Sequence, residues 1–352
     1  MGLATRVGLN PTKEPHDFNR GSRSVNILVI KMKNNENKYI PNEIYTVLRK
    51  QHYQIKEHSA VKLCGWVKKS LLENKDCYKS KFYGIATHRC IQCTPAVIWC
   101  QQSCIFCWRA LPSDIGMDKN SNYKMPKWEE PEIVAEDILK MHNTLITGYK
   151  GILDRIGEQK YNELSNPKHV ALSLSGEPTI YPYFKELIEI FHKKGFSTFV
   201  VSNGILTEVI EEINPTQLYV SVDAYDLDSY KKICMGNETQ WNKIMDTLDI
   251  LGDKKRTCLR TTLIRDYNDD IKKFIPIYEK ANANLIELKS YMNVGYSRKR
   301  LNLDDMLKHE EILELSKILD ENSFYKLEDD AFDSRVSVLM NENKKIKMKL
   351  FE

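Results

Sequence analysis

The segment CQQSCIFCWRALPSD, residues 100–114, carries three cysteines in the spacing Cys-x3-Cys-x2-Cys. Three is an unusual number, because a structural zinc takes four ligands and disulfides use cysteines in pairs. Three thiolates can instead bind three irons of a [4Fe-4S] cluster and leave the fourth iron open to a small molecule. A zinc site that takes Cys93 or His88 as its fourth ligand is the alternative. The segment therefore predicts a metal centre and favours a cluster with one free coordination position.

The composition is that of a globular protein in a reducing compartment. The chain has 352 residues, 42% hydrophobic and 28% charged, with a net charge of +4. No apolar run is long enough for a membrane span, and the N-terminal MGLATRVGLNPTKEPHD lacks the apolar core of a secretory signal. We therefore expect a cytoplasmic protein. Its nine cysteines, crowded toward the first third of the chain, then indicate metal binding rather than disulfides.

Short β-branched runs alternate with longer amphipathic segments over most of the chain. This alternation predicts an α/β fold with six parallel strands and right-handed crossover helices, either an open doubly wound sheet or a partial barrel. The expected strands are 96–100, 169–175, 197–202, 218–224, 259–264 and 285–292. The expected helices are 129–147, 182–194, 205–213, 226–252, 268–282 and 304–321. Residues 41–75 also have a helical pattern, and 333–339 with 345–351 are expected to form a closing hairpin.

Polar residues follow several of the expected strands. Ser175, Gly176 and Glu177 follow the second, Asn203 the third and Asp223 the fourth. The carboxyl ends of parallel strands meet at one edge of a sheet or barrel, where active sites form. Each residue alone could serve as an ordinary turn or cap, but together they predict a site near residues 100–107.

The two motifs together resemble the radical S-adenosylmethionine (SAM) superfamily. The resemblance rests on the cysteine spacing, on Phe106 before the last cysteine, and on SLSGEPT (173–179), where Ser175 stands in place of a glycine. It implies a partial (β/α)6 barrel similar to a TIM barrel. It also implies that Cys100, Cys104 and Cys107 bind a [4Fe-4S] cluster and that its open iron chelates SAM. The cofactor-binding residues would be Phe106, Ser175, Gly176, Glu177, Asn203 and Asp223.

A second set of three cysteines precedes the first. Cys64, Cys77 and Cys90 are separated by twelve residues each. A second three-thiolate set predicts a second [4Fe-4S] cluster with an open iron. Incidental buried thiols are the alternative, and Cys93, Cys234 and Cys258 match no ligand position.

With both sets, the chain resembles the radical SAM tRNA 4-demethylwyosine synthases of the wybutosine pathway, without the flavodoxin-like domain of eukaryotic members. The resemblance covers about residues 45–330, through segments such as TPAVIWCQQSCIFCWR and YMNVGYSRKRL. It implies a carbon–carbon lyase that joins pyruvate to the N1-methylguanosine beside the anticodon of tRNA-Phe. A radical would take hydrogen from the N1-methyl group, and the new carbon radical would add to the pyruvate carbonyl.

The resemblance also implies further site residues and partners. Lys79 would activate pyruvate as a Schiff base or bind its carboxylate, although it could equally be a solvated lysine. Arg298, Lys299 and Arg300 in YSRKRL would contact RNA phosphates, or form an ordinary basic turn. An external donor of the flavodoxin or ferredoxin type would supply electrons. We expect a monomer.

These expectations divide the chain into four parts. They are a mobile extension (1–40), an auxiliary cluster region (41–93), the radical SAM core (94–325) and a C-terminal extension (326–352). Two other functions stay open on the residues alone: another radical SAM enzyme that modifies RNA, such as a methylthiolase, and a non-enzymatic RNA-binding protein stabilised by metal.

Overall fold

A computed structural model of the protein describes residues 37–118 and 123–351. The predicted mobile extension therefore lies outside the described residues up to position 36. The next four residues are ordered, because the Asn37 side chain accepts hydrogen bonds from the backbone of Tyr39 and Ile40, and Ile40 is buried. Residues from Asn37 onward belong to one compact unit. None of the described helices has the length and apolar character that a membrane crossing requires.

The described residues form one ten-stranded mixed sheet in the order β1-β2-β3-β4-β5-β6-β7-β8-β10-β9. The parallel strands run consecutively from β3 to β8, as a partial (β/α)6 barrel requires. They are β3 (Cys90–Thr94), β4 (His169–Leu172), β5 (Ser197–Ser202), β6 (Gln217–Ser221), β7 (Thr257–Leu263) and β8 (Leu285–Ser290).

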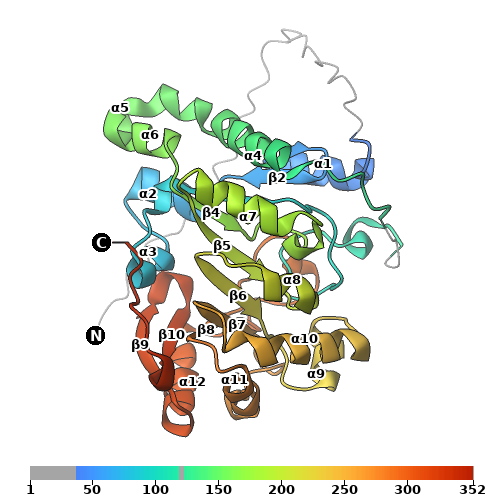
Figure 1. Ribbon diagram of the computed structural model, residues 1–352, viewed down its shortest axis with the longest axis vertical. Helices are drawn as coiled ribbons and strands as arrows, with labels where there is room; N and C mark the ends of the chain where they lie inside the picture. Colours follow the sequence, from blue (N-terminus) through green and yellow to red (C-terminus); the bar gives the residue numbers. More distant parts are fainter. Residues whose placement is uncertain (1–36, 119–122, 352) are drawn as a thin grey trace, which may run out of the picture. The chain divides into compact units, whose positions relative to one another are not determined.

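Helices cover the outer face of this sheet (Figure 1). Alternate strand residues such as Val170, Val200 and Val220 point outward, because successive side chains in a strand face opposite sides. They pack against the apolar stripes of the helices that follow each strand. These helices are α4 (Pro131–Ile146), α7 (Phe184–Lys193), α8 (Thr207–Glu212), α10 (Glu238–Leu251), α11 (Ile275–Ala281) and α12 (His309–Asn322).

The other alternate residues, among them Phe199 and Tyr219, face the inner side. This inner face is covered at one end by α3 (Tyr78–Tyr83) and the C-terminal residues, which lie side by side in Figure 1. The backbone N–H of Leu350 donates to the carbonyl of Tyr83 at 2.9 Å. A Cβ atom on Gly84 would lie 2.0 Å from the Phe351 carbonyl oxygen, so this approach requires glycine.

Antiparallel strands extend the sheet at both edges. β1 (Gln54–Lys56) and β2 (Ser59–Lys62) precede β3, and β10 (Val336–Asn341) pairs with β8 and with β9 (Tyr325–Ala331). The hairpin predicted at 333–339 and 345–351 is therefore wrong. Its real strands begin earlier in the chain, and residues 345–351 run across the open end of the inner face instead.

The first parallel strand also differs from its prediction. Residues 96–100 form no strand, because the pairing of β3 stops at Thr94 and Pro95 has no N–H to continue the ladder. The predicted boundary between residues 93 and 94 therefore cuts through β3. Residues 58–64 contain β2 rather than helix, and the helix expected over 226–252 is broken at Met235, whose φ is 56°. The other helices are α1 (Asn42–Lys50), α2 (Gly65–Glu73), α5 (Leu153–Ile156), α6 (Glu158–Ser165) and α9 (Leu227–Ile233).

A buried ion pair on the inner face joins β7 to β8. The Glu287 carboxylate is fully buried and pairs with the Arg260 guanidinium at 2.8 Å. It also accepts hydrogen bonds from the hydroxyls of Tyr83 at 2.5 Å and Tyr78 at 3.1 Å. Burial opposes ionisation of Glu287, but Arg260 and Lys79 outweigh it, and the pKa is lowered. The carboxylate is thus charged at neutral pH and offsets the buried cations around it.

Replacing Glu287 by Gln should destabilise the cofactor-free protein by about 3 kcal/mol, because it leaves the Arg260 charge buried without its partner. Urea unfolding followed by circular dichroism measures this loss. The control is Glu314→Gln on the exposed face of α12, for which we expect a change within about 0.5 kcal/mol. Equal unfolding midpoints for the two variants would contradict the assigned role of Glu287.

Candidate active site

The cysteines of the 100–107 motif lie together on the irregular segment that follows β3. This segment is fastened to the end of α9, because the N–H groups of Ser103 and Ile105 donate to the carbonyls of Cys234 and Ile233. The thiols of Cys100, Cys104 and Cys107 are free and partly exposed. A loop held in this way can present three thiolates to one bound group.

The pKa values of Cys100 and Cys104 depend on burial and on nearby thiols and charges. Burial raises the pKa of Cys100 to about 11, with Arg109 opposing the rise and Cys104 adding to it. A hydrogen bond with Cys234, burial and the nearby Cys107 raise the pKa of Cys104. The thiols of Cys100 and Cys104 are therefore protonated at neutral pH in the free protein, and iron binding would release these protons. Three free, adjoining thiols beside the Arg109 cation suit an iron–sulfur cluster, whose bound form carries negative charge.

The turn after β4 packs directly on the cysteine segment. The Ser175 hydroxyl donates to the Val97 carbonyl at 2.6 Å, and the Glu177 N–H donates to the Trp99 carbonyl at 2.7 Å. Gly176 has a φ of 71°, and a Cβ atom there would lie 1.7 Å from the Ala96 carbonyl oxygen. Only glycine permits this approach. The turn thereby fixes the backbone just before Cys100.

Glu177 and Asn203 connect the ends of β4 and β5 to the cysteines. The buried Glu177 carboxylate accepts hydrogen bonds from Thr179 and from the N–H of Asn203, the latter at 2.8 Å. The Asn203 side-chain nitrogen donates to the Gln101 side-chain oxygen at 3.2 Å and lies 4.0 Å from the Cys100 sulfur. The Glu177 carboxylate is thus hydrogen-bonded to protein groups, whereas the Asn203 side chain lies next to Cys100.

Asp223 and Phe106 are also held within the protein. Asp223 accepts a 2.6 Å hydrogen bond from the Thr262 N–H, and burial raises its pKa to about 6. Asp223 is close enough to Cys104 to raise the pKa of that thiol. Phe106 packs, partly buried, in an apolar cluster that also contains Cys234.

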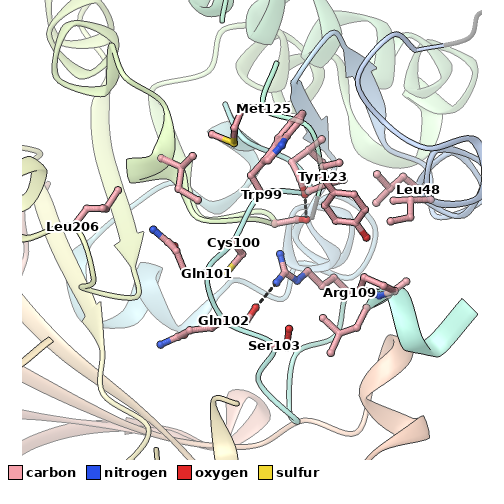
Figure 2. A pocket seen from close by; sticks show the side chains of 18 residues that line it. Leu48, Trp99, Cys100, Gln101, Gln102, Ser103, Arg109, Tyr123, Met125 and Leu206 are labelled. Carbon is pink, nitrogen blue, oxygen red and sulfur yellow. Dashed lines mark hydrogen bonds between the residues drawn. The ribbon is translucent and has the colours of Figure 1, made fainter. Parts of the chain in front are cut away.

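A cavity of about 620 Å³ opens beside the cysteine segment (Figure 2). Its lining comes from α1, the segment 97–103, the segment 109–112 and the turn after β4, and includes Cys100, Ser175 and Arg109. Figure 2 shows the Arg109 guanidinium donating to the Gln102 carbonyl, a 2.9 Å hydrogen bond. The volume is typical of cofactor pockets.

The cysteines of the second set each lie at the start of a helix or strand. Cys64 and Cys77 precede the first turns of α2 and α3, and Cys90 begins β3. Burial and Cys64 raise the pKa of Cys77 to about 11, against the opposing effect of Lys79 and Lys289. Burial, with Cys64 and Cys77, raises the pKa of Cys90 to about 12, and Lys79 opposes this rise. Cys64 contributes to both shifts and so lies near Cys77 and Cys90. Like the first set, they are free and partly exposed.

Lys79 extends from α3 over the inner face. Its ammonium nitrogen lies 5.1 Å from the ring centre of Phe199 and 4.7 Å from that of Tyr219. Burial and the nearby Arg260 lower the pKa of Lys79, and the charges of Glu287, Cys77 and Cys90 oppose this shift. An amine with a lowered pKa beside the second cysteine set can act as a nucleophile.

Sequence analysis missed three charged residues of this inner site: Arg260, Glu287 and Lys289. Burial and Arg260 lower the pKa of Lys289 to about 8, and its nitrogen donates to the Ser334 carbonyl at 2.5 Å. A signal was available, because these residues interrupt the apolar runs LRTTLI and LIELKSYM. Glu287 and Lys289 are two positions apart and so share one face of β8.

The basic YSRKRL segment divides into two kinds of side chain. Arg298 and Lys299 are exposed, although Arg298 donates to the Asn293 carbonyl and Lys299 to the Asp114 carbonyl. The side chain of Arg300 turns inward and pairs with Asp114. Its guanidinium is occupied by protein partners, so Arg300 is not placed to meet a phosphate.

Three cysteines on the loop after the first parallel strand of a partial barrel define a radical SAM enzyme. The model of the radical SAM superfamily matches residues 95–275, and this match confirms the predicted class and fold. A second family model, described as wyosine base formation, matches residues 280–341. The second match narrows the class to enzymes of wyosine synthesis.

Known relatives give the family. The chain is 69% identical over 311 residues to the S-adenosyl-L-methionine-dependent tRNA 4-demethylwyosine synthase of Methanocaldococcus jannaschii, covering 88% of this chain and 100% of that protein. It is 42% identical over 318 residues to the Pyrococcus abyssi synthase, covering 87% and 91%. A solved structure of TYW1 with a lysine–pyruvate adduct bound has 66% identity and a TM-score of 0.83, covering 89% of this chain and 100% of that one. The chain belongs to the family of SAM-dependent tRNA 4-demethylwyosine synthases.

Replacing Gly176 by Ala should displace the turn that supports Cys100. The left-handed backbone alone costs roughly 1–2 kcal/mol for alanine, and the overlap with Ala96 adds to it. We expect weaker SAM binding to the reconstituted enzyme and a lower urea midpoint. Gly148→Ala is the control, because a Cβ atom at Gly148 meets nothing within 4 Å. Unchanged SAM affinity in Gly176→Ala would refute the role of this turn.

Proposed function

We propose that this enzyme joins pyruvate to the N1-methylguanosine beside the anticodon of tRNA-Phe and so forms the tricyclic 4-demethylwyosine base. One observation carries the proposal. The Lys79 amine lies over the inner-face rings of Phe199 and Tyr219, within electrostatic reach of Cys77 and Cys90. A related structure, 66% identical, is described with a lysine–pyruvate adduct bound. Lys79 is our candidate for the corresponding lysine.

Each of the two cysteine sets would bind one iron–sulfur cluster. Cys100, Cys104 and Cys107 would hold the [4Fe-4S] cluster that meets SAM, and Cys64, Cys77 and Cys90 would hold a second one. When bound, the first cluster would supply the electron for cleavage of SAM and thereby the radical chemistry needed at the N1-methyl group. All six cysteines are free of disulfides and partly exposed, which supports these two ligand groups.

The residues around Cys100 would bind SAM. The backbone of Ser175 and Gly176 offers carbonyls for its amino group, and Asn203 lies beside Cys100 to contact the ribose or methionine part. Glu177 would hold the ends of β4 and β5 together, and Asp223 those of β6 and β7, since their carboxylates already accept hydrogen bonds from backbone N–H groups. Phe106 would pack beneath the cluster.

The inner face would prepare pyruvate. The neutral Lys79 amine would attack the keto carbon and, with loss of water, give an imine that holds pyruvate in place. Arg260 and Lys289 would attract the carboxylate, because they place further positive charge on this face, where Arg260 lowers the pKa of both Lys79 and Lys289. The neighbouring rings would keep water away from the imine.

Other parts of the proposal concern partners. The exposed side chains of Arg298 and Lys299 would contact phosphates of the tRNA. A flavodoxin- or ferredoxin-like protein would deliver the electron in the cytoplasm. We propose a monomeric enzyme, because the unit beginning at Asn37 has its own continuous core.

Iron analysis tests the second cluster. Anaerobically reconstituted protein should contain about eight irons per chain, and Cys77→Ala should contain about four. Cys93→Ala should keep about eight, because the Cys93 thiol is buried in the outer core. Equal iron contents in the Cys77 and Cys93 variants would exclude the auxiliary ligand set.

Product analysis tests the reaction and Lys79 together. Enzyme, SAM, a strong reductant, pyruvate and tRNA-Phe carrying N1-methylguanosine should yield the tricyclic nucleoside by mass spectrometry of the digest. Cyanoborohydride should reduce the pyruvate imine to a stable secondary amine on Lys79. Lys79→Ala should lose both product and adduct.

The matched control is Lys81→Ala, which removes a lysine of the same helix whose nitrogen instead pairs with Asp329 at 2.7 Å. This variant should keep product and adduct. A full-strength adduct in Lys79→Ala would move the imine to another lysine, and Lys289 would be the next to replace.

A further inference from the structure

The Arg300 side chain lies against the backbone of the cysteine segment. Its Nε donates to the Ile105 carbonyl at 3.0 Å, and one Nη nitrogen donates to the carbonyl of Cys107 and, at 3.5 Å, to that of Arg109. Three carbonyls around the last cysteine of the motif thus share one guanidinium. Such multiple donation uses the planar fork of arginine, which lysine cannot reproduce.

Asp114 fixes the other side of this guanidinium. Its carboxylate pairs with Arg300, and the same oxygen accepts a 2.7 Å hydrogen bond from the Leu111 N–H. Both side chains are largely buried, with 14% of Arg300 and 5% of Asp114 exposed. A buried, fully hydrogen-bonded pair of this kind holds one geometry, because breaking it leaves an uncompensated charge.

Neighbouring contacts bring the two segments together. The Tyr296 N–H donates to the Trp108 carbonyl at 3.0 Å, and a Cβ atom on Gly295 would lie 2.4 Å from the same carbonyl oxygen. Lys299 donates to the Asp114 carbonyl at 2.5 Å. Residues 295–300 therefore contact residues 105–114 at several points, and residues 105–111 of that segment form no helix or strand.

Fixing these carbonyls also fixes amide groups. In a trans peptide the N–H of the following residue points away from the carbonyl. With the Ile105 and Cys107 carbonyls directed at Arg300, the N–H groups of Phe106 and Trp108 are directed to the opposite side of the loop. Amide hydrogen bonds to cluster sulfurs are one of the means by which a protein sets the reduction potential.

We propose that Arg300 is a positioning residue of the radical SAM site: held by Asp114, it orients the peptide groups around Cys107 and thereby the surroundings of the cluster bound there. This inference rests on the proposed ligand role of Cys107. It replaces the expectation that Arg300 contacts tRNA. Arg298, two residues earlier and exposed, keeps that expectation.

The test compares Arg300→Ala, Arg300→Lys and Asp114→Asn with Arg298→Ala, all in a Cys77→Ala background intended to leave only the cluster of interest. The readouts are the electron paramagnetic resonance spectrum of the reduced cluster, its midpoint potential, and tRNA affinity as a function of salt. Arg300→Ala and Asp114→Asn should change the spectrum and shift the potential, with the salt slope unchanged. Arg300→Lys should not restore the wild-type spectrum.

Arg298→Ala should do the reverse: the slope of log affinity against log salt should fall by about 0.7, as for one lost contact to a single strand, with an unchanged spectrum. If Arg300→Ala changes only the salt slope, Arg300 is a phosphate contact and the proposal fails. It also fails if Asp114→Asn leaves spectrum and potential unaltered, an outcome that decides the matter even where Arg300→Ala does not fold. Retention of the cluster in Cys107→Ala would instead disprove the ligand assignment.

Discussion

The inner face of the barrel depends on the buried carboxylate of Glu287. Arg260, Lys79 and Lys289 bring cations to this face, and each would lose its hydration there without a compensating charge. Glu287 compensates Arg260 directly and receives two tyrosine hydroxyls, which satisfy its remaining lone pairs. The face can therefore be electropositive without being unstable. That character suits an anionic substrate such as pyruvate and keeps the Lys79 amine closer to its neutral form.

The cysteine segment poses a different problem, because thiolates must point at one group from a backbone without helix or strand. The structure solves this by holding the segment from three directions. The end of α9 binds Ser103 and Ile105, the turn at Gly176 packs before Cys100, and residues 295–300 hold the backbone beyond Cys104. These contacts use mainly backbone groups of the loop, so the thiols of Cys100 and Cys107 do not take part in them.

Local patterns predicted much of this arrangement. The runs 197–202, 259–264 and 285–292 all fall on strands, because β-branched residues that alternate with turn signals are a local property. The order of the cysteines gave the class before any contact was visible. Features that depend on contacts between distant residues were not predicted. The first parallel strand ends before Pro95, and residues 345–351 cover the inner face instead of forming a strand. Arg300 pairs with Asp114, which is distant in the sequence.

The roles of individual basic residues likewise depend on contacts between distant parts of the chain. Nothing in the run YSRKRL distinguishes a buried arginine from two exposed neighbours, because the distinction depends on a partner 186 positions away in the sequence. Likewise, the lysine count alone could not separate Lys79 from a solvated lysine. Burial over Phe199 and Tyr219 is what marks Lys79 as unusual.

Two buried ion pairs connect the segment matched by the radical SAM model with the segment matched by the wyosine model. Arg260 and Asp114 belong to the radical SAM segment 95–275, whereas their partners Glu287 and Arg300 belong to the wyosine segment 280–341. Each pair crosses from one segment to the other, one beside the pyruvate candidate Lys79 and one beside Cys107. The wyosine segment also supplies β8 and β10 to the same sheet. The wyosine segment is therefore an integral part of the fold. It contributes one partner of a buried ion pair to the cysteine segment and one partner to the inner face.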